Sequence, residues 1–181
     1  AKEPILLTDF TVTNGDSALG RVVSDALRAG LTESRVISLV PIEATAAALQ
    51  RMQRPANARL DLAVARELAA REGYKLIVDG QLTPFGSSGY IVVIRLATAG
   101  SATELASYRE PADGPDALIG AVDKLARKVR GKIGESLRSV QAAPPLERVT
   151  TASLDALGKY SEAWRANWTE RDFPKAVALY R

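Results

Sequence analysis

The side chains of this sequence that could carry out chemistry are mainly carboxylates. Asp9, Asp79, Glu104 and Glu110 fall on or beside expected strands. A glycosidase-type pair needs two carboxyl groups about 5 to 9.5 Å apart in a cleft, and the spacing along the chain singles out no pair. Asp9 stands out because it closes an apolar strand just before a turn into a helix. Solvated or ion-paired surface acids are the favoured interpretation, and a carboxylate-dependent enzyme using Asp9 and Asp79 is the alternative.

The composition excludes several other kinds of site. The 181 residues include no histidine and no cysteine, which excludes Ser–His–Asp and Cys–His triads and zinc sites built from His and Cys. Neither G-x-x-x-x-G-K-[ST] nor G-x-G-x-x-G occurs, so these phosphate-binding loops are absent too. We expect no catalytic residue, no metal and no cofactor.

The charge balance limits the classes of partner. Lys and Arg number 24 and Asp and Glu 21, which gives a net charge of +3. This excess is too mild for a typical nucleic-acid module, so we expect no nucleic-acid partner. No apolar run approaches the roughly 18–20 residues that span a bilayer. Because the chain begins without Met and stops inside a helical pattern, we expect a segment of a longer protein, with membrane attachment only through an anchor outside it.

Hydrophobic spacing predicts elements in the order β-α-β-α-α-β-β-β-α. Apolar residues three and four apart predict two helices, the first capped by Asp16 or Ser17 and the second by Asp61, and Gly73 marks the end of the second. Period-two runs and short apolar runs bounded by turns predict strands over 5–10, 36–40, 75–82, 90–96 and 105–110. The pattern predicts an α/β (α+β) fold with a mixed five-stranded sheet covered by helices.

The C-terminal part is expected to be helical. A long amphipathic helix is predicted over 115–140, with a basic face that lacks aromatic neighbours and is therefore interpreted as solvated. Two prolines, Pro144 and Pro145, interrupt this pattern and stiffen the chain. We expect an α/β domain over 1–141, a linker over 142–149 and an αα-hairpin over 150–181, its first helix capped by Thr150 or Thr151.

The candidates for binding residues are Asp9, Asn14, Trp164 and Trp168. Asn14 belongs to an Asn-Gly-Asp turn between a strand and a helix, a position where anions often bind. Asp16 would repel a phosphate there, so a plain turn is favoured. The two tryptophans are four residues apart and share one helix face, which either the next helix or a partner would cover.

Two portions of the chain resemble known families. The run ILLTDF over 5–10, followed by Asn-Gly-Asp, a helix and a strand, resembles the amino-terminal α/β domain of TolB and related bacterial envelope domains. Residues 5–160 resemble a region that follows the kinase domain and membrane helix of many bacterial eukaryotic-like serine/threonine kinases; its most specific stretch is PLERVTTASLDAL over 145–157. Since no kinase motif occurs in this chain, the resemblance implies no catalytic residue.

The terminal hairpin resembles the start of a tetratricopeptide repeat (TPR). The matches to its small and aromatic positions are Ala163, Phe173, Ala176 and Tyr180. The two aromatic residues among them are expected to pack between the helices. Trp164 stands where a small residue is usual, so we expect an atypical leading helix pair, as at the end of a repeat array.

These resemblances imply a non-catalytic sensing or protein-interaction module of a larger envelope or signalling protein. They place it on the extracytoplasmic side of a bacterial membrane, in a serine/threonine kinase-like protein with TPRs. A protein or peptide partner is expected, and a small ligand is possible. The alternatives are a structural TPR scaffold capped by the α/β part, and the carboxylate-dependent enzyme.

Overall fold

The computed structural model describes residues 4–168 and 170–180, apart from the side chains of residues 137, 138 and 168. In this described part, six strands form one mixed sheet in the order β3-β1-β4-β5-β6, and β2 also pairs with β4. The strands are β1 (Pro4–Leu7), β2 (Thr11–Val12), β3 (Ser38–Leu39), β4 (Leu76–Phe85), β5 (Gly89–Thr98) and β6 (Glu104–Ala112). The mixed α/β fold expected from the sequence is therefore confirmed, with one short strand more than predicted.

The sheet combines two kinds of pairing. Strand β1 is parallel to both β3 and β4, whereas β4, β5 and β6 form an antiparallel meander. The unpredicted strand β2 pairs in parallel with the distal part of β4. Strand β3 is shorter than the 36–40 expected, because the N–H groups of Val36 and Ile37 both donate to the Ser34 hydroxyl and Pro41 has no N–H to extend the ladder.

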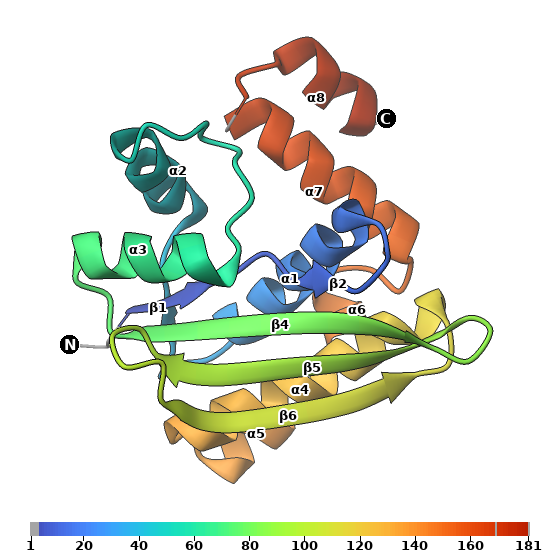
Figure 1. Cartoon of the computed structure of the whole chain (residues 1–181). Coiled ribbons are helices and arrows are strands. Elements are labelled where there is room, and N and C mark those ends of the chain that lie inside the picture. Colours follow the sequence, from blue (N-terminus) through green and yellow to red (C-terminus); the bar gives the residue numbers. More distant parts are fainter. Residues whose placement is uncertain (1–3, 169, 181) are drawn as a thin grey trace.

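Helices cover both faces of the sheet (Figure 1). Helices α1 (Ser17–Thr32) and α4 (Leu118–Ile133) pack on one face in the larger apolar cluster, and α2 (Ile42–Arg51) and α3 (Leu62–Glu72) pack on the other in a smaller one. Strand β1 contributes Ile5 and Leu7 to the first cluster and Leu6 to the second. A strand buried on both faces reads as a continuous apolar run, as this one does.

The predicted helix boundaries near the site are confirmed. The carboxylate of Asp16 accepts the N–H of Ala18 at the start of α1, and Asp61 accepts the N–H of Val64 at the start of α3. Gly73 ends α3 in the left-handed conformation, with φ of 78°. These caps use backbone donors that a helix start leaves without an intrahelical partner.

The prediction of one long helix over 115–140 was wrong, because the helix is interrupted at Gly134. A 3₁₀ turn (Pro115–Ala117) leads into α4, which ends at Ile133 with Gly134 at φ of 103°. Ser136 then caps a separate helix, α5 (Leu137–Ala142). The break turns Glu135 inward onto Arg130, although the apolar spacing on either side of it stays helical.

The remaining helices lie against α1 and α4. Leu146, in the short helix α6 (Leu146–Val149), is 1% exposed and donates its N–H to Asp123 of α4. Arg127 of α4 donates to the carbonyls of Val140 and Ala143. Helix α7 (Leu154–Trp168) begins later than expected, because Ser153 is its first capping side chain. It forms a hairpin with α8 (Phe173–Tyr180) and lies beside α1 (Figure 1).

Candidate functional site

Two hollows meet on the outer side of α1. A small cavity of about 70 Å³ lies at the carboxyl end of β1, between α1 and the segment from α2 to Leu60. A larger groove of about 1040 Å³ runs between α1, β3 and the start of α2 on one side and α6 and α7 on the other. Four residues line both hollows: Asp25, Arg28, Ile42 and Arg165.

The topology explains the position of the small cavity. From β1 the chain passes through α1 to β3 on one side, while β4 lies on the other side, so the strand order reverses at β1. The carboxyl end of a strand at such a reversal is the usual ligand-binding position of parallel α/β sheets. Thr8 and Asp9 lie at this end and line the cavity.

Asp9 links the end of β1 to the segment before α3. Its Oδ2 accepts the N–H of Leu60 at 2.9 Å and lies 3.7 Å from Nε of Arg21. The N–H of Asp9 in turn donates to the carbonyl of Leu60. These contacts join the end of β1 to the loop before α3, so the carboxylate predicted as a candidate lies in the cavity but already has partners.

The structure does not bring Asp9 and Asp79 into one cavity. Asp79 lies on β4 and lines neither hollow. Its Oδ1 accepts the hydroxyl of Thr8 at 2.8 Å, and its Oδ2 lies 4.0 Å from Arg95. Burial raises the pKa of Asp79, against the effect of the Thr8 hydrogen bond and of Arg95. The Asp9–Asp79 pair on which the enzyme alternative rests is therefore not formed in either hollow.

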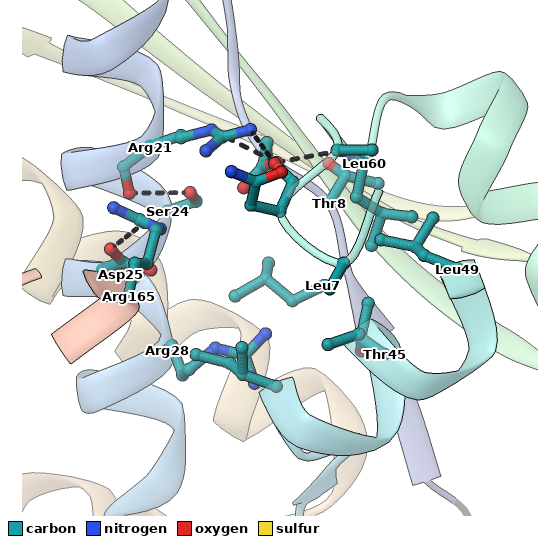
Figure 2. Close-up of a pocket in the computed structure, with 16 residues that line it drawn as sticks. Leu7, Thr8, Arg21, Ser24, Asp25, Arg28, Thr45, Leu49, Leu60 and Arg165 are labelled. Carbon is teal, nitrogen blue, oxygen red and sulfur yellow. Dashed lines mark hydrogen bonds and ion pairs between the residues drawn. The ribbon is translucent and has the colours of Figure 1, made fainter. Parts of the chain in front are cut away.

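Sequence reasoning missed the charged residues between the two hollows. Arg21, Asp25 and Arg28 are spaced four and three residues apart, which places them on one face of α1. Arg165 reaches across from α7 to form an ion pair with Asp25 (Figure 2). The helical spacing of these residues could have predicted a charged face on α1, whereas nothing in the sequence indicates that Arg165 joins it.

Burial opposes the charges of this cluster. It raises the pKa of Asp25, against the Coulombic effect of Arg165. It also lowers the pKa of Arg28, whose Nη1 donates to the carbonyl of Val40 at 3.0 Å. The floor between the hollows thus holds two guanidinium groups against the one carboxylate of Asp25, all on half-buried residues.

The groove has apolar and aromatic walls around these charges. Leu39 of β3 lines one side, and Tyr160 and Trp164 of α7 line the other. Tyr160 is 57% exposed, and its ring meets that of Tyr180 edge-on at 5.9 Å. An apolar lining with a few polar groups is typical of a binding site, and the groove is large enough for a peptide or a drug-sized ligand.

The other predicted site residues are placed as follows. Asn14 adopts a left-handed turn with φ of 53° and lines neither hollow. The side chain of Trp168 lies outside the described residues. Ala163 and Ala176 are buried in the hairpin, whereas Phe173 is 60% and Tyr180 51% exposed.

Neither a metal-binding cluster nor a membrane-spanning helix occurs among the described residues. Within residues 4–168 and 170–180, no cluster of three or more carboxylates could hold a metal ion. Over the same residues, no helix has the length and apolar character needed to cross a bilayer.

The comparisons with known proteins show the fold. No protein-family model and no characterised protein sequence matches the chain. The C-terminal domains of LpoB from Escherichia coli and Salmonella enterica are each 16% identical, over 61% of this chain and 82% of theirs, with TM-scores of 0.52 and 0.51. TolB from Acinetobacter baumannii is 15% identical, over 80% of this chain and 29% of its own, with a TM-score of 0.42. This chain thus has a fold similar to that of the LpoB C-terminal domain, and the comparisons give no support for a kinase-associated region or a TPR.

Proposed function

We propose that this chain is a non-catalytic protein-interaction module that binds its partner in the groove between α1, β3 and α7. The groove carries the proposal, because it is large, open and lined by apolar and aromatic side chains around a charged floor. The carboxylates of Asp9, Asp25 and Asp79 each face a guanidinium or hydroxyl group. Such groups are better suited to holding the fold than to performing a chemical step.

The similarity to known proteins supports a binding role at the bacterial envelope. The sequence of the first strand and helix resembles TolB and related envelope domains, and the fold is similar to that of the LpoB C-terminal domain. We propose that this module acts on the extracytoplasmic side of a bacterial membrane. Fold similarity alone does not assign function, so the groove remains the main argument.

A finer proposal concerns the parent protein. The stretch over 145–157 resembles the region that follows the membrane helix in bacterial serine/threonine kinase-like proteins, and α7 and α8 form a helical hairpin. We propose that the module is the extracytoplasmic part of such a protein. Because α7 both lines the groove and forms the hairpin, a bound partner would shift the packing of any repeats that follow.

Selection of binders from a displayed library of random peptides tests the interaction role. The variant Trp164→Ala removes an aromatic wall of the groove. Phe85→Ala is the matched control, because Phe85 is an exposed aromatic residue in β4 that does not line the groove. We expect selected peptides to bind Trp164→Ala at least tenfold more weakly and Phe85→Ala unchanged. A selection that yields no peptide sensitive to Trp164→Ala contradicts the proposal.

A further inference from the structure

Strand β3 leaves one edge of the sheet without a neighbouring strand in the described part of the chain, and this edge lies in the groove. Strand β3 stands at the end of the strand order, and among the described residues it pairs only with β1. Both of its residues, Ser38 and Leu39, line the groove. An uncovered edge strand presents backbone donors and acceptors that another chain can use.

The register shows which backbone groups face the groove. Leu39 is the partner of Ile5 in the parallel ladder, and the N–H of the next residue, Val40, donates to the carbonyl of Ile5 at 2.9 Å. Backbone groups of successive residues in a strand point to opposite sides. The N–H and carbonyl of Leu39 therefore point away from β1, toward the open edge.

Arg28 offers a contact for an acidic group beside this edge, and Glu43 at the start of α2 lines the same groove. Arg28 of α1 lines the groove and donates through Nη1 to the carbonyl of Val40, directly after β3. The side chains of Asp25 and Arg165 are 20% and 17% exposed and pair with each other. A guanidinium carries five N–H donors, so Arg28 retains donors for a carboxylate placed next to the strand.

We propose that the partner contributes an extended peptide segment that adds to β3 as a further strand and places an acidic side chain against Arg28. Its backbone pairs with the N–H and carbonyl of Leu39, and its side chains contact the aromatic wall that includes Trp164. This mode of recognition draws affinity from main-chain hydrogen bonds and specificity from alternate side chains. The inference rests on the proposed function and names the class of partner.

Backbone methylation of a bound peptide tests the strand pairing. A peptide selected on the whole chain, and sensitive to Trp164→Ala, is resynthesised with an N-methyl group at each position in turn. Successive N–H groups of an added strand alternate between facing β3 and facing away. We expect binding to weaken at least tenfold at the one position whose N–H donates to the carbonyl of Leu39, and to stay within about twofold at the two neighbouring positions, whose N–H groups face away from β3.

Arg28→Gln tests the acidic contact, with Arg66→Gln as the control, because Arg66 also donates to backbone carbonyls but lies outside the groove. We expect Arg28→Gln to weaken binding about tenfold, Arg66→Gln to leave it unchanged, and an Asp→Asn or Glu→Gln change in the peptide to remove the difference between native chain and Arg28→Gln. Equal weakening at adjacent positions of the peptide, or binding that does not depend on Arg28, overturns the inference and leaves the groove as the binding site. Absence of any peptide sensitive to Trp164→Ala overturns the proposed function itself.

Discussion

Glu135 accepts two hydrogen bonds from the guanidinium of Arg130, at 2.6 Å to Oε1 and 2.8 Å to Oε2. The two side chains are only 2% and 4% exposed. The hydroxyls of Ser34 and Ser139 donate to the same carboxylate. Because Ser34 shapes the turn that enters β3, this ion pair connects the end of α4 to the open edge of the groove.

Glu135→Gln is expected to destabilise the fold by about 3–5 kcal/mol, because it leaves the charge of Arg130 buried without its counter-charge. Urea unfolding at neutral pH measures the change. Asp155→Asn is the control, because Asp155 pairs with Lys159 on side chains that are 80% and 62% exposed, where an ion pair contributes about 0–1 kcal/mol. Equal losses in the two variants would contradict this role of Glu135.

The same pair predicts an acid-dependent stability. The hydrogen bonds from Arg130 are the main cause that lowers the pKa of Glu135 from 4.5 to about 2 in the folded protein. A carboxyl group whose pKa is lowered by folding stabilises the fold fully above its unfolded pKa and loses that contribution as the pH falls toward its folded pKa. We expect the difference in unfolding free energy between the native chain and Glu135→Gln to be constant above about pH 5 and to shrink between pH 4.5 and 2.

The contribution of Glu135 to acid stability is measured as the difference in unfolding free energy between the native chain and Glu135→Gln, because other carboxyl groups also titrate. Burial raises the pKa values of Asp25 and Asp79, so these two groups stabilise the fold as the pH falls and act against Glu135. Urea unfolding of both proteins at several pH values gives a difference in which the contribution of Asp25 and Asp79, common to both proteins, cancels. A difference that stays constant down to pH 3 would rule out Glu135 as the responsible group.

Two glycines three residues apart are expected to respond in opposite directions to alanine. Gly134 has φ of 103° at the end of α4, a conformation that costs an L-residue about 1 kcal/mol or more. Gly131 lies inside α4 with nothing within 4 Å of an added Cβ, and alanine there favours the helix by about 0.5–1 kcal/mol. Thermal unfolding should show Gly134→Ala lowered and Gly131→Ala raised in melting temperature. Two shifts of the same sign would contradict the break assigned to Gly134.

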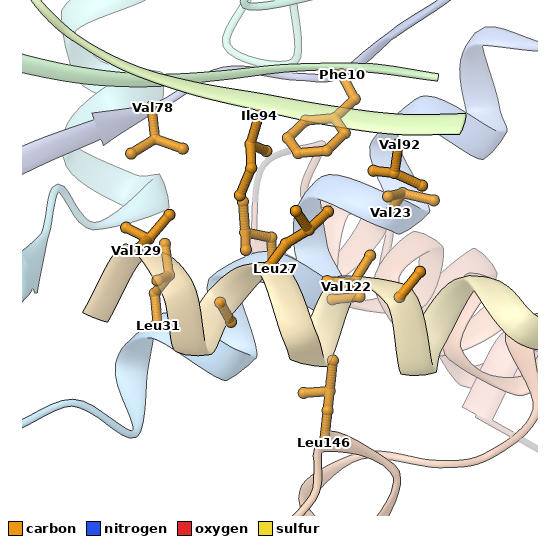
Figure 3. Packing of buried hydrophobic residues seen from close by; sticks show 14 of the residues in the cluster. Phe10, Val23, Leu27, Leu31, Val78, Val92, Ile94, Val122, Val129 and Leu146 are labelled. Atoms are coloured by element: carbon orange, nitrogen blue, oxygen red, sulfur yellow. The ribbon is translucent and has the colours of Figure 1, made fainter. Parts of the chain in front are cut away.

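Gly80 of β4 is expected to tolerate no side chain, because the ring of Phe10 lies directly against it. A Cβ at Gly80 would be 2.2 Å from Cζ of Phe10, which is fully buried in the core shown in Figure 3. Gly80→Ala should therefore destabilise the fold by about 1–3 kcal/mol through overpacking. Gly100→Ala is the control, since it meets no atom within 4 Å. The free energy of unfolding of the two variants checks this, and a neutral Gly80→Ala would refute the contact.

The ion pair of Asp25 with Arg165 is expected to hold α7 against α1. Asp25→Asn removes the counter-charge of a guanidinium that is 17% exposed. We expect amide hydrogen exchange in α7 to accelerate about tenfold or more, since the helix can then separate more easily from α1. Asp155→Asn, within α7 itself, should leave that exchange unchanged. Equal protection in both variants would show that apolar packing alone holds the helix.

Local signals predicted most of the fold. The spacing of apolar residues in α1 and the capping side chains of Asp16 and Asp61 depend on neighbouring residues only, and these features were found. The break at Gly134 was not found, because Leu137 and Val140 continue the apolar spacing of α4. The interruption places Glu135 in a buried ion pair with Arg130. This contact depends on tertiary packing, which the spacing of apolar residues along the chain does not reveal.

The candidate site was predicted only in part. Asp9 was identified from its place at the end of an apolar strand, and it does line the small cavity. The groove depends on α7 lying beside α1, which brings Arg165 to Asp25 across 140 residues of chain. Trp164 was also identified from the sequence and lines the groove. No short-range pattern contains the contact between Asp25 and Arg165, so the charged residues beside Trp164 could not be predicted.

The pairing of β1 has a consequence for how the chain reaches its folded state. The meander of β4, β5 and β6 is closed by short turns, whereas β1 joins β4 at Ile5 and Leu76 and must also receive β3. Contacts between residues far apart in sequence form slowly, because the entropy of closing a long loop is lost first. We therefore expect the meander and α4 to assemble early and β1 to insert late. A nascent or partly denatured chain would then keep a structured half while its recognition edge does not yet exist.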